Sequence, residues 1–196
     1  IYFRKLKAND KMTSDILKQI KFSKLIELDV RDNFKIKDVS FLTSLRKLNA
    51  SGSNCRISQE DIHGLNLVEL DVWGNSKIKD VSFMTNLRKL NACGYDCGIP
   101  QEGIHGLNLV ELHMWNNSKI NDVSFMTGLR KLNARGSKCG ITQEGIQGLN
   151  LVELNVSDNS KIKDVSFMTN LRKLNAGGSD CGITQEDIHG LNLVEL

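Results

Sequence analysis

The sequence lacks most features that would point to an enzyme, a membrane protein or a disordered chain. Its 196 residues include one proline and no low-complexity run, so no linker between domains can be located. It has no apolar stretch long enough to cross a bilayer, and no Walker loop, GxGxxG, HExxH or CxxC motif. Because 26 basic and 23 acidic residues are interleaved, no basic tract predicts nucleic-acid binding. We therefore expect a soluble, non-enzymatic protein without a cofactor, and contact with neither nucleic acid nor membrane.

What the sequence does contain is repetition. The stretch 67–108 reads LVELDVWGNSKIKDVSFMTNLRKLNACGYDCGIPQEGIHGLN, and it recurs almost unchanged as 109–150 and 151–192. A diverged copy covers 25–66. Self-similarity at a fixed period of 42 residues predicts a repeat architecture without one central core.

Each 42-residue unit has two halves, of 20 and 22 residues, that restart the same apolar pattern. The pattern positions of the first half are Leu67, Leu70, Val72, Asn75 and Ile78, and those of the second are Leu87, Leu90, Ala92, Cys97 and Ile99. Both halves resemble the leucine-rich repeat, and this resemblance covers nearly the whole chain. It implies an α/β repeat solenoid: a right-handed horseshoe with parallel strands on the concave face and short 3₁₀ or helical turns on the convex face. At a finer level, the alternation of DVSFMTNLRKLNA with QEGIHGLN resembles leucine-rich repeat proteins of marseillevirus-type large DNA viruses of amoebae.

The repeats divide the chain into two predicted regions. Residues 1–24 form a diverged N-terminal repeat that begins at Phe3 and is partly helical, because Ile16, Leu17 and Ile20 fall at helical spacing behind a cap at Ser14 or Asp15. Residues 25–196 form the array, with double repeats at 25–66, 67–108, 109–150 and 151–192 and the start of a further repeat. An array without a polar terminal repeat exposes a sheet edge, so we expect an excerpt of a longer protein and end-to-end self-association through the C-terminal edge.

Two short helical turns are expected within each unit. Asp80 precedes Val81 and is a good N-cap for one tight helical turn in the first half. In the second half, Ser58 or Thr142 precedes Gln-Glu, which favours a short helix with an acid in its first turn.

Four of the five cysteines occupy one position in successive units: Cys55, Cys97, Cys139 and Cys181. Two strands separate them, or about 10 Å, whereas a disulfide needs Cα atoms within about 7 Å, so we expect four buried free thiols. Cys93 falls in an outward position, which predicts an exposed, reactive thiol. Free thiols without a signal peptide indicate an intracellular location, in the host cytoplasm or the virion if the protein is viral.

Strand alternation predicts three outward columns of side chains. The first column alternates Lys and Glu from Lys5 to Glu195 and forms a charge ladder that holds the register. The second column is Lys7, Asp29, Asn49, Asp71, Asn91, His113, Asn133, Asn155 and Asn175. The third is Asn9, Arg31, Ser51, Trp73, Cys93, Trp115, Arg135, Ser157 and Gly177.

The third column changes at nearly every step, whereas the inward positions hardly change. Both tryptophans of the protein fall in it, and Trp, Tyr and Arg dominate binding hot spots. We therefore predict a site for a protein partner on the concave face, formed by Trp73, Trp115, Arg31, Arg135, His113, Tyr95 and Asp71.

Three other interpretations stay open. Neutral drift would also change exposed positions. A structural role would stack arrays end to end. An enzyme would use Cys93 and His113, on adjacent strands, as a nucleophile and base, but no oxyanion pocket is evident and this interpretation is the weakest of the three.

Overall fold

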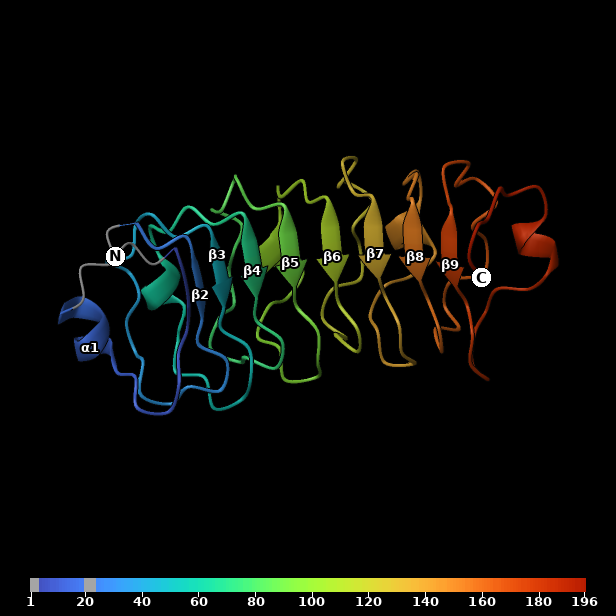
Figure 1. Cartoon of the computed structure of the whole chain (residues 1–196). Coiled ribbons are helices and arrows are strands. Elements are labelled where there is room, and N and C mark those ends of the chain that lie inside the picture. Colours follow the sequence, from blue (N-terminus) through green and yellow to red (C-terminus); the bar gives the residue numbers. More distant parts are fainter. Residues whose placement is uncertain (1–3, 20–23) are drawn as a thin grey trace. The chain divides into compact units, whose positions relative to one another are not determined.

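The computed structural model describes residues 4–19 and 24–196, which form short parallel strands joined by turns and few helices (Figure 1). The strands are β1 (Lys5–Lys7), β2 (Glu27–Asp29), β3 (Lys47–Asn49), β4 (Glu69–Asp71), β5 (Lys89–Asn91), β6 (Glu111–His113), β7 (Lys131–Asn133), β8 (Glu153–Asn155) and β9 (Lys173–Asn175). The helices are α1 (Ser14–Gln19) and the 3₁₀ helices η1 (Glu60–Ile62), η2 (Glu102–Ile104), η3 (Glu144–Ile146) and η4 (Glu186–Ile188). The chain is a parallel β-solenoid with a period of ~21 residues, as the repeats predict.

Two compact units make up the chain. The first comprises Ile1–Asn91 and Asp96–Leu107 and contains β1 to β5, and the second comprises Ala92–Tyr95 and Asn108–Leu196 and contains β6 to β9. Within each unit successive strands pair in parallel, with their central leucines aligned, such as Leu28 with Leu48 and Leu132 with Leu154. The expected division at residue 24 stays a prediction, and Phe3 and Ile20, on which it partly depended, lie outside the described residues.

The leucine spacing produces these strands because each three-residue strand points its central side chain inward. Leu70 is buried, as are Val72 in the following turn and Val81 and Met84 on the return segment. Side chains on either side of the leucine point outward and are half-buried or exposed. Each turn therefore contributes only a few apolar side chains, so its burial depends on the turns stacked against it.

Buried asparagines join successive turns. The Nδ2 of Asn75 donates to the carbonyl oxygens of Ala50 and Ile57 in the preceding turn, at 2.9 and 3.1 Å. Its Oδ1 accepts from the N–H of Lys77 in its own turn. Asn117 and Asn159 repeat the bond to the preceding turn in the second unit. Among the described residues every buried side-chain nitrogen and oxygen has a hydrogen-bond partner.

A second polar bridge lies away from the strands. The Oε1 of Gln59 accepts from the N–H groups of Lys79 and Asp80, and its Nε2 donates to the Asp80 carbonyl at 2.7 Å. Gln143 makes the same contacts in the second unit. In the diverged first repeat, the hydroxyl of Ser14 takes this place and accepts from the N–H groups of Lys37 and Asp38. The helix α1 thus positions a substitute for the missing glutamine.

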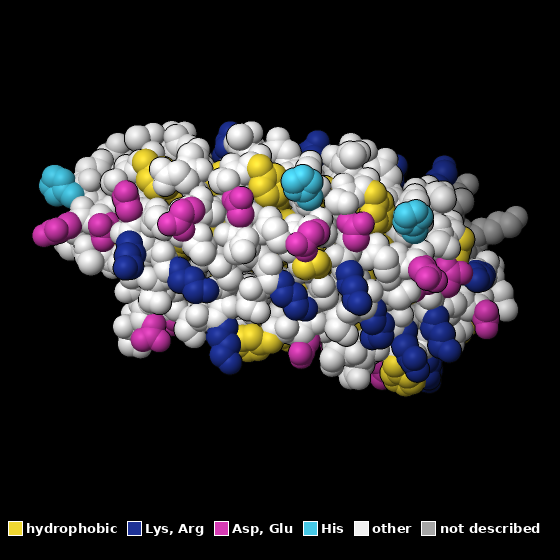
Figure 2. All heavy atoms as spheres, turned by 180° about the vertical axis from the view of Figure 1, so that it is seen from behind, with side chains coloured by type: hydrophobic (Ala, Val, Ile, Leu, Met, Phe, Trp, Pro, Cys, Tyr) yellow, Lys and Arg dark blue, Asp and Glu magenta, His cyan; other side chains and the backbone are white. Residues whose placement is uncertain are grey.

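Seen from behind, charged side chains of both signs alternate with separate hydrophobic ones (Figure 2). In the first unit, the ring of His63 packs against Phe83 at 5.1 Å between centroids.

Two predicted helix starts need correction. The N-cap of α1 is Thr13, whose Oγ1 accepts from the N–H of Ile16, because the hydroxyl of Ser14 is already occupied by the next turn. Asp80 does accept from the N–H of Ser82, at 2.8 Å, but residues 81–86 form consecutive tight turns and no helix. The short helices after Ser58 and Thr142 are confirmed as η1 and η3.

We expect Asn75→Ala to lower the free energy of unfolding by about 2–4 kcal/mol. The change leaves the buried carbonyl oxygens of Ala50 and Ile57 without their amide donor, and an unpaired buried polar group costs roughly 1–3 kcal/mol. Urea unfolding followed by circular dichroism measures the effect. The control is Asn86→Ala, because the Asn86 amide makes only an exposed bond to Asn66. Equal unfolding midpoints for the two variants would contradict the bridging role.

Candidate functional site

Side chains of the second column hold the backbone of the third. The Oδ1 of Asp71 accepts from the N–H of Trp73 at 3.0 Å. Asn133 does the same for the N–H of Arg135, two residues further along the chain, at 3.2 Å. An Asp or Asn at this position therefore fixes where the next outward side chain leaves the strand.

His113 breaks this pattern in the second unit, since a His side chain does not supply this short acceptor. The N–H of Trp115 instead donates to the Sγ of Cys93 at 3.2 Å. The Nε2 of His113 lies 2.8 Å from a carboxylate oxygen of Glu111 on the same strand. The backbone N–H of Trp115 thus joins Trp115 to Cys93, while His113 contacts Glu111.

The prediction that Cys93 is exposed is wrong. Only 6% of Cys93 is accessible, and Ser51 and Ser157 in the same column are equally buried. The hydroxyl of Ser51 turns back to donate to Asn49, and that of Ser157 donates to Asn155. Small side chains at this position stay against the sheet, and only long ones project into solvent.

The large residues of the column do project. Trp73 is 46% exposed and Trp115 38% exposed. Each is followed by a residue with left-handed backbone, Gly74 at φ 65° and Asn116 at φ 55°, which turns the chain away from the strand. The added Cβ of an alanine at Gly136 would lie 3.3 Å from the indole of Trp115, so this ring rests on the next turn.

Tyr95 is the most exposed of the predicted aromatic residues, at 54%. The ammonium group of Lys138 lies 5.1 Å from the centre of its ring, a cation–π contact within the second unit. Tyr95 therefore presents a ring that already carries a positive charge beside it.

The two predicted arginines differ in how closely an acidic side chain pairs with them. Arg31 forms a two-pronged ion pair with Asp29, at 2.8 to 3.0 Å. Burial raises the pKa of Asp29, but the hydrogen bonds and charge of Arg31 outweigh burial and leave the pKa below its usual value. Arg135 is paired less closely, because its nearest carboxylate, on Asp158, lies 3.7 Å away. Arg135 is consequently the better placed of the two to contact a partner.

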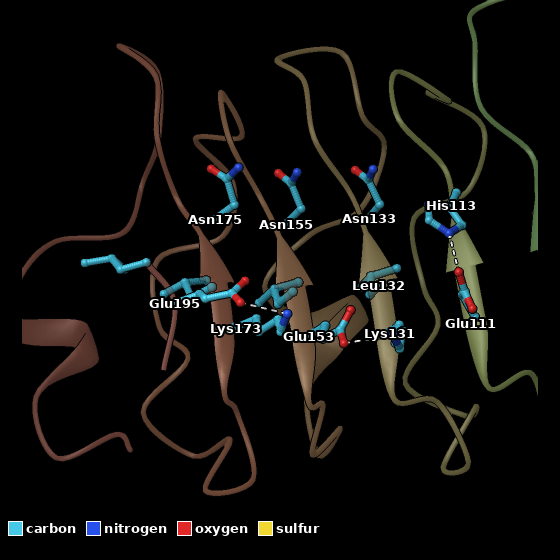
Figure 3. A pocket seen from close by; sticks show the side chains of 13 residues that line it. Glu111, His113, Lys131, Leu132, Asn133, Glu153, Asn155, Lys173, Asn175 and Glu195 are labelled. Atoms are coloured by element: carbon cyan, nitrogen blue, oxygen red, sulfur yellow. Dashed lines mark hydrogen bonds and ion pairs between the residues drawn. The ribbon is translucent and has the colours of Figure 1, made fainter. Parts of the chain in front are cut away.

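A depression of about 390 Å³ lies on the outward face of β6 to β9 (Figure 3). Ion pairs line one side of it: Lys131 with Glu153 at 2.8 Å and Lys173 with Glu195 at 2.9 Å. The charge ladder therefore contains pairs in which a Lys contacts the next Glu of the ladder, as Lys47 also contacts Glu69 at 2.7 Å and Lys5 contacts Glu27 at 2.7 Å in the first unit. A row of three asparagines, with His113 at its end, forms the other side: Asn133, Asn155 and Asn175.

The sequence prediction missed this row. Its signal was the second column itself, which holds Asp at residues 29 and 71 but only Asn from residue 133 onward.

The seven predicted site residues divide between the two units. Arg31, Asp71 and Trp73 belong to the first, and Tyr95, His113, Trp115 and Arg135 belong to the second. Within the second unit, β6 and β7 place His113 beside Asn133 and bring Trp115 next to Arg135, since the N–H of Asn116 donates to the Arg135 carbonyl. A single patch that joins all seven residues stays a prediction.

Comparison with family models and with curated proteins finds no match to this chain. Within residues 4–19 and 24–196, no helix is both long and apolar enough to span a bilayer. In the same ranges no group of three His, Cys, Asp or Glu side chains is arranged to hold a metal ion.

We expect the thiols to react in an order set by burial. Cys55, Cys93, Cys97 and Cys139 are buried, whereas Cys181 is half-buried, so the expectation of four buried thiols is wrong for Cys181. Burial also raises the pKa of the Cys55 and Cys139 thiols, which lowers their thiolate fraction. With a thiol reagent at neutral pH, mass spectrometry after short exposure should find label first on Cys181. Faster labelling of Cys93 would restore the exposed assignment.

Proposed function

We propose that this chain is a non-enzymatic interaction module that binds a protein partner with the outward face of its strands. The observation that carries the proposal is Trp115, a large apolar side chain that is 38% exposed on an ordered scaffold. Its N–H is bonded to Cys93 and its carbonyl accepts from the N–H of Gly94, so its backbone is fixed before any partner arrives. A ring held in this way loses little conformational entropy on binding.

The neighbours of Trp115 supply the other elements of a contact site. Arg135 follows the next strand, and its nearest carboxylate lies 3.7 Å away. Tyr95 in the same unit adds a second exposed ring. Buried interface centres are enriched in these three residue types. In the first unit Trp73 offers a comparable ring, with Asp71 holding its backbone.

The leucine-rich repeat resemblance is part of the proposal. Strands that recur every 20 and 22 residues and buried asparagines between turns support it. In that family's horseshoe, the outward strand face would be the concave one. We also propose the resemblance to the marseillevirus-type proteins. A row of free thiols favours an intracellular location, which is likewise part of the proposal.

A second candidate function is assembly through the last turn. Leu196 and Val194 are exposed, and Leu196 lies beside Leu174, Ile183 and Ile188 around a depression of about 340 Å³. Such an apolar edge favours stacking of one copy on another. Sedimentation at increasing concentration would show this as a concentration-dependent increase in mass that Leu196→Asp abolishes.

For the main proposal, we expect Trp115→Ala to weaken binding by about 2 kcal/mol, or roughly 30-fold, when Trp115 is a hot spot. The probe is a set of peptides selected by the full chain from a random displayed library, with their dissociation constants measured by titration. Trp73→Ala is tested in parallel for the first unit. Both variants should unfold close to the wild type, because an outward side chain contributes little packing.

The control is Leu70→Ala, which removes a buried side chain and should destabilise the fold by roughly 2–5 kcal/mol. If both tryptophan variants bind the selected peptides as tightly as the wild type, the outward-face site is wrong and assembly becomes the leading function.

A further inference from the structure

The asparagine row of the depression on β6 to β9 presents hydrogen-bond donors. The side-chain oxygens of its three asparagines already accept backbone N–H groups, Asn133 from Arg135, Asn155 from Ser157 and Asn175 from Gly177, at 3.1 to 3.3 Å. The corresponding nitrogens, Nδ2, have no partner in the part of the chain that the structure describes. Each amide is thus oriented by the fold so that its NH₂ group is the half available to a ligand.

The carboxylates of Glu153 and Glu195 lie on the other side of the depression, and each is engaged by a lysine through one oxygen. Glu153 is paired with Lys131, and Glu195 is paired with Lys173 (Figure 3). Sugars, whose hydroxyls both donate and accept, suit a site with both kinds of group. The asparagine row instead suits a ligand that offers acceptors alone.

The spacing of the asparagine row narrows the choice of ligand further. Adjacent strands lie about 4.8 Å apart, so the amides of Asn133 and Asn175, two strands apart, are roughly 9.6 Å from each other. A peptide in the polyproline II conformation rises about 3.1 Å per residue, which places its carbonyls i and i+3 about 9.3 Å apart. A β-strand peptide repeats its same-side carbonyls at about 6.8 Å, which matches neither one strand spacing nor two.

We propose that this face binds a proline-rich segment in the polyproline II conformation, running across β7 to β9. Proline has no N–H, so such a segment offers carbonyl acceptors and no donor that would be left unpaired. Its rings would meet the imidazole ring of His113, at the end of the asparagine row. Polyproline II ligands commonly dock in grooves lined by aromatic side chains. The inference rests on the proposed function and names the class of partner.

The test uses the full chain and a hexaproline peptide with blocked ends, titrated into the millimolar range. The side-chain NH₂ signals of Asn133 and Asn175 should shift in nuclear magnetic resonance spectra, because their nitrogens donate to carbonyls i and i+3 of the peptide. The deciding variant is Asn133→Asp with Asn175→Asp, which removes two NH₂ groups and keeps the oxygens that accept from the backbone. Asp29 and Asp71 hold the same column and make that acceptor bond, so the scaffold tolerates the change.

We expect the double variant to bind hexaproline about tenfold more weakly or worse, with the backbone signals of Arg135 and Gly177 unchanged. Asn86→Asp is the control, since it makes the same exchange at an exposed amide outside the depression and should leave binding as in the wild type.

Three results would overturn the inference: no shift of the asparagine signals, equal binding by the double variant, or equal shifts with hexaglycine. Cellohexaose that moved the same signals when hexaproline did not would replace the peptide by a carbohydrate. The proposed function is judged separately, by the library peptides and Trp115→Ala. If those peptides depend on Trp115 while hexaproline fails to bind, only the polyproline inference falls.

Discussion

The structure depends on the buried carboxamide that joins one turn to the next. A strand of three residues with one inward leucine cannot exclude water from its own backbone, and its interior carbonyls need donors. Asn75 supplies them: one NH₂ group serves two carbonyls of the preceding turn, while its oxygen holds Lys77 in its own turn. Away from the strands, the side chain of Gln59 likewise donates to a backbone carbonyl and accepts from a backbone N–H of the next turn. Because neighbouring turns depend on these bonds, the residues that make them cannot change, and variation is confined to the outward positions.

The second column applies the same chemistry on the outside. Its Asp or Asn oxygen accepts the N–H two residues ahead, so this oxygen belongs to the fold. What remains is an NH₂ group in Asn155 and a second carboxylate oxygen in Asp71, which accepts from the Nδ2 of Asn49 at 3.3 Å. An Asp-for-Asn exchange therefore keeps the backbone and replaces an outward donor by an outward acceptor. One scaffold can in this way carry either a donor or an acceptor at the same position of its second column.

Much of this could be predicted from the sequence, because leucine spacing and strand alternation decide which residues point inward. They placed the strands, the parallel solenoid and the burial of Cys55, Cys97 and Cys139. Alternation gives the direction of a Cβ atom but not how far neighbouring atoms reach, so it misplaced Cys93. The helix start at Ser14 was wrong because a hydroxyl can serve either its own helix or the next turn, and sequence does not show which.

The site was harder to predict than the fold for the same reason. The exposed tryptophans stood out because they differ between copies, whereas the asparagine row looked like an unremarkable polar column. Its meaning depends on which amide oxygen is occupied, and that requires the backbone geometry after each strand. Repetition in the sequence shows that these asparagines belong to the scaffold. Only the structure shows that their amide oxygens bond the backbone and that their NH₂ groups face outward.

Cys93, His113 and Trp115 show why variation in the outward columns is not a set of independent changes. A histidine at residue 113 removes the Asp or Asn oxygen that would hold the N–H of residue 115, and the sulfur of Cys93 takes its place. The acceptor lost in one turn is thus replaced from the turn before it. Unconstrained drift at exposed positions has no reason to supply such compensation, whereas a need to keep Trp115 fixed and exposed does. The compensation falls at the end of the asparagine row, where a bound segment would first meet an aromatic ring.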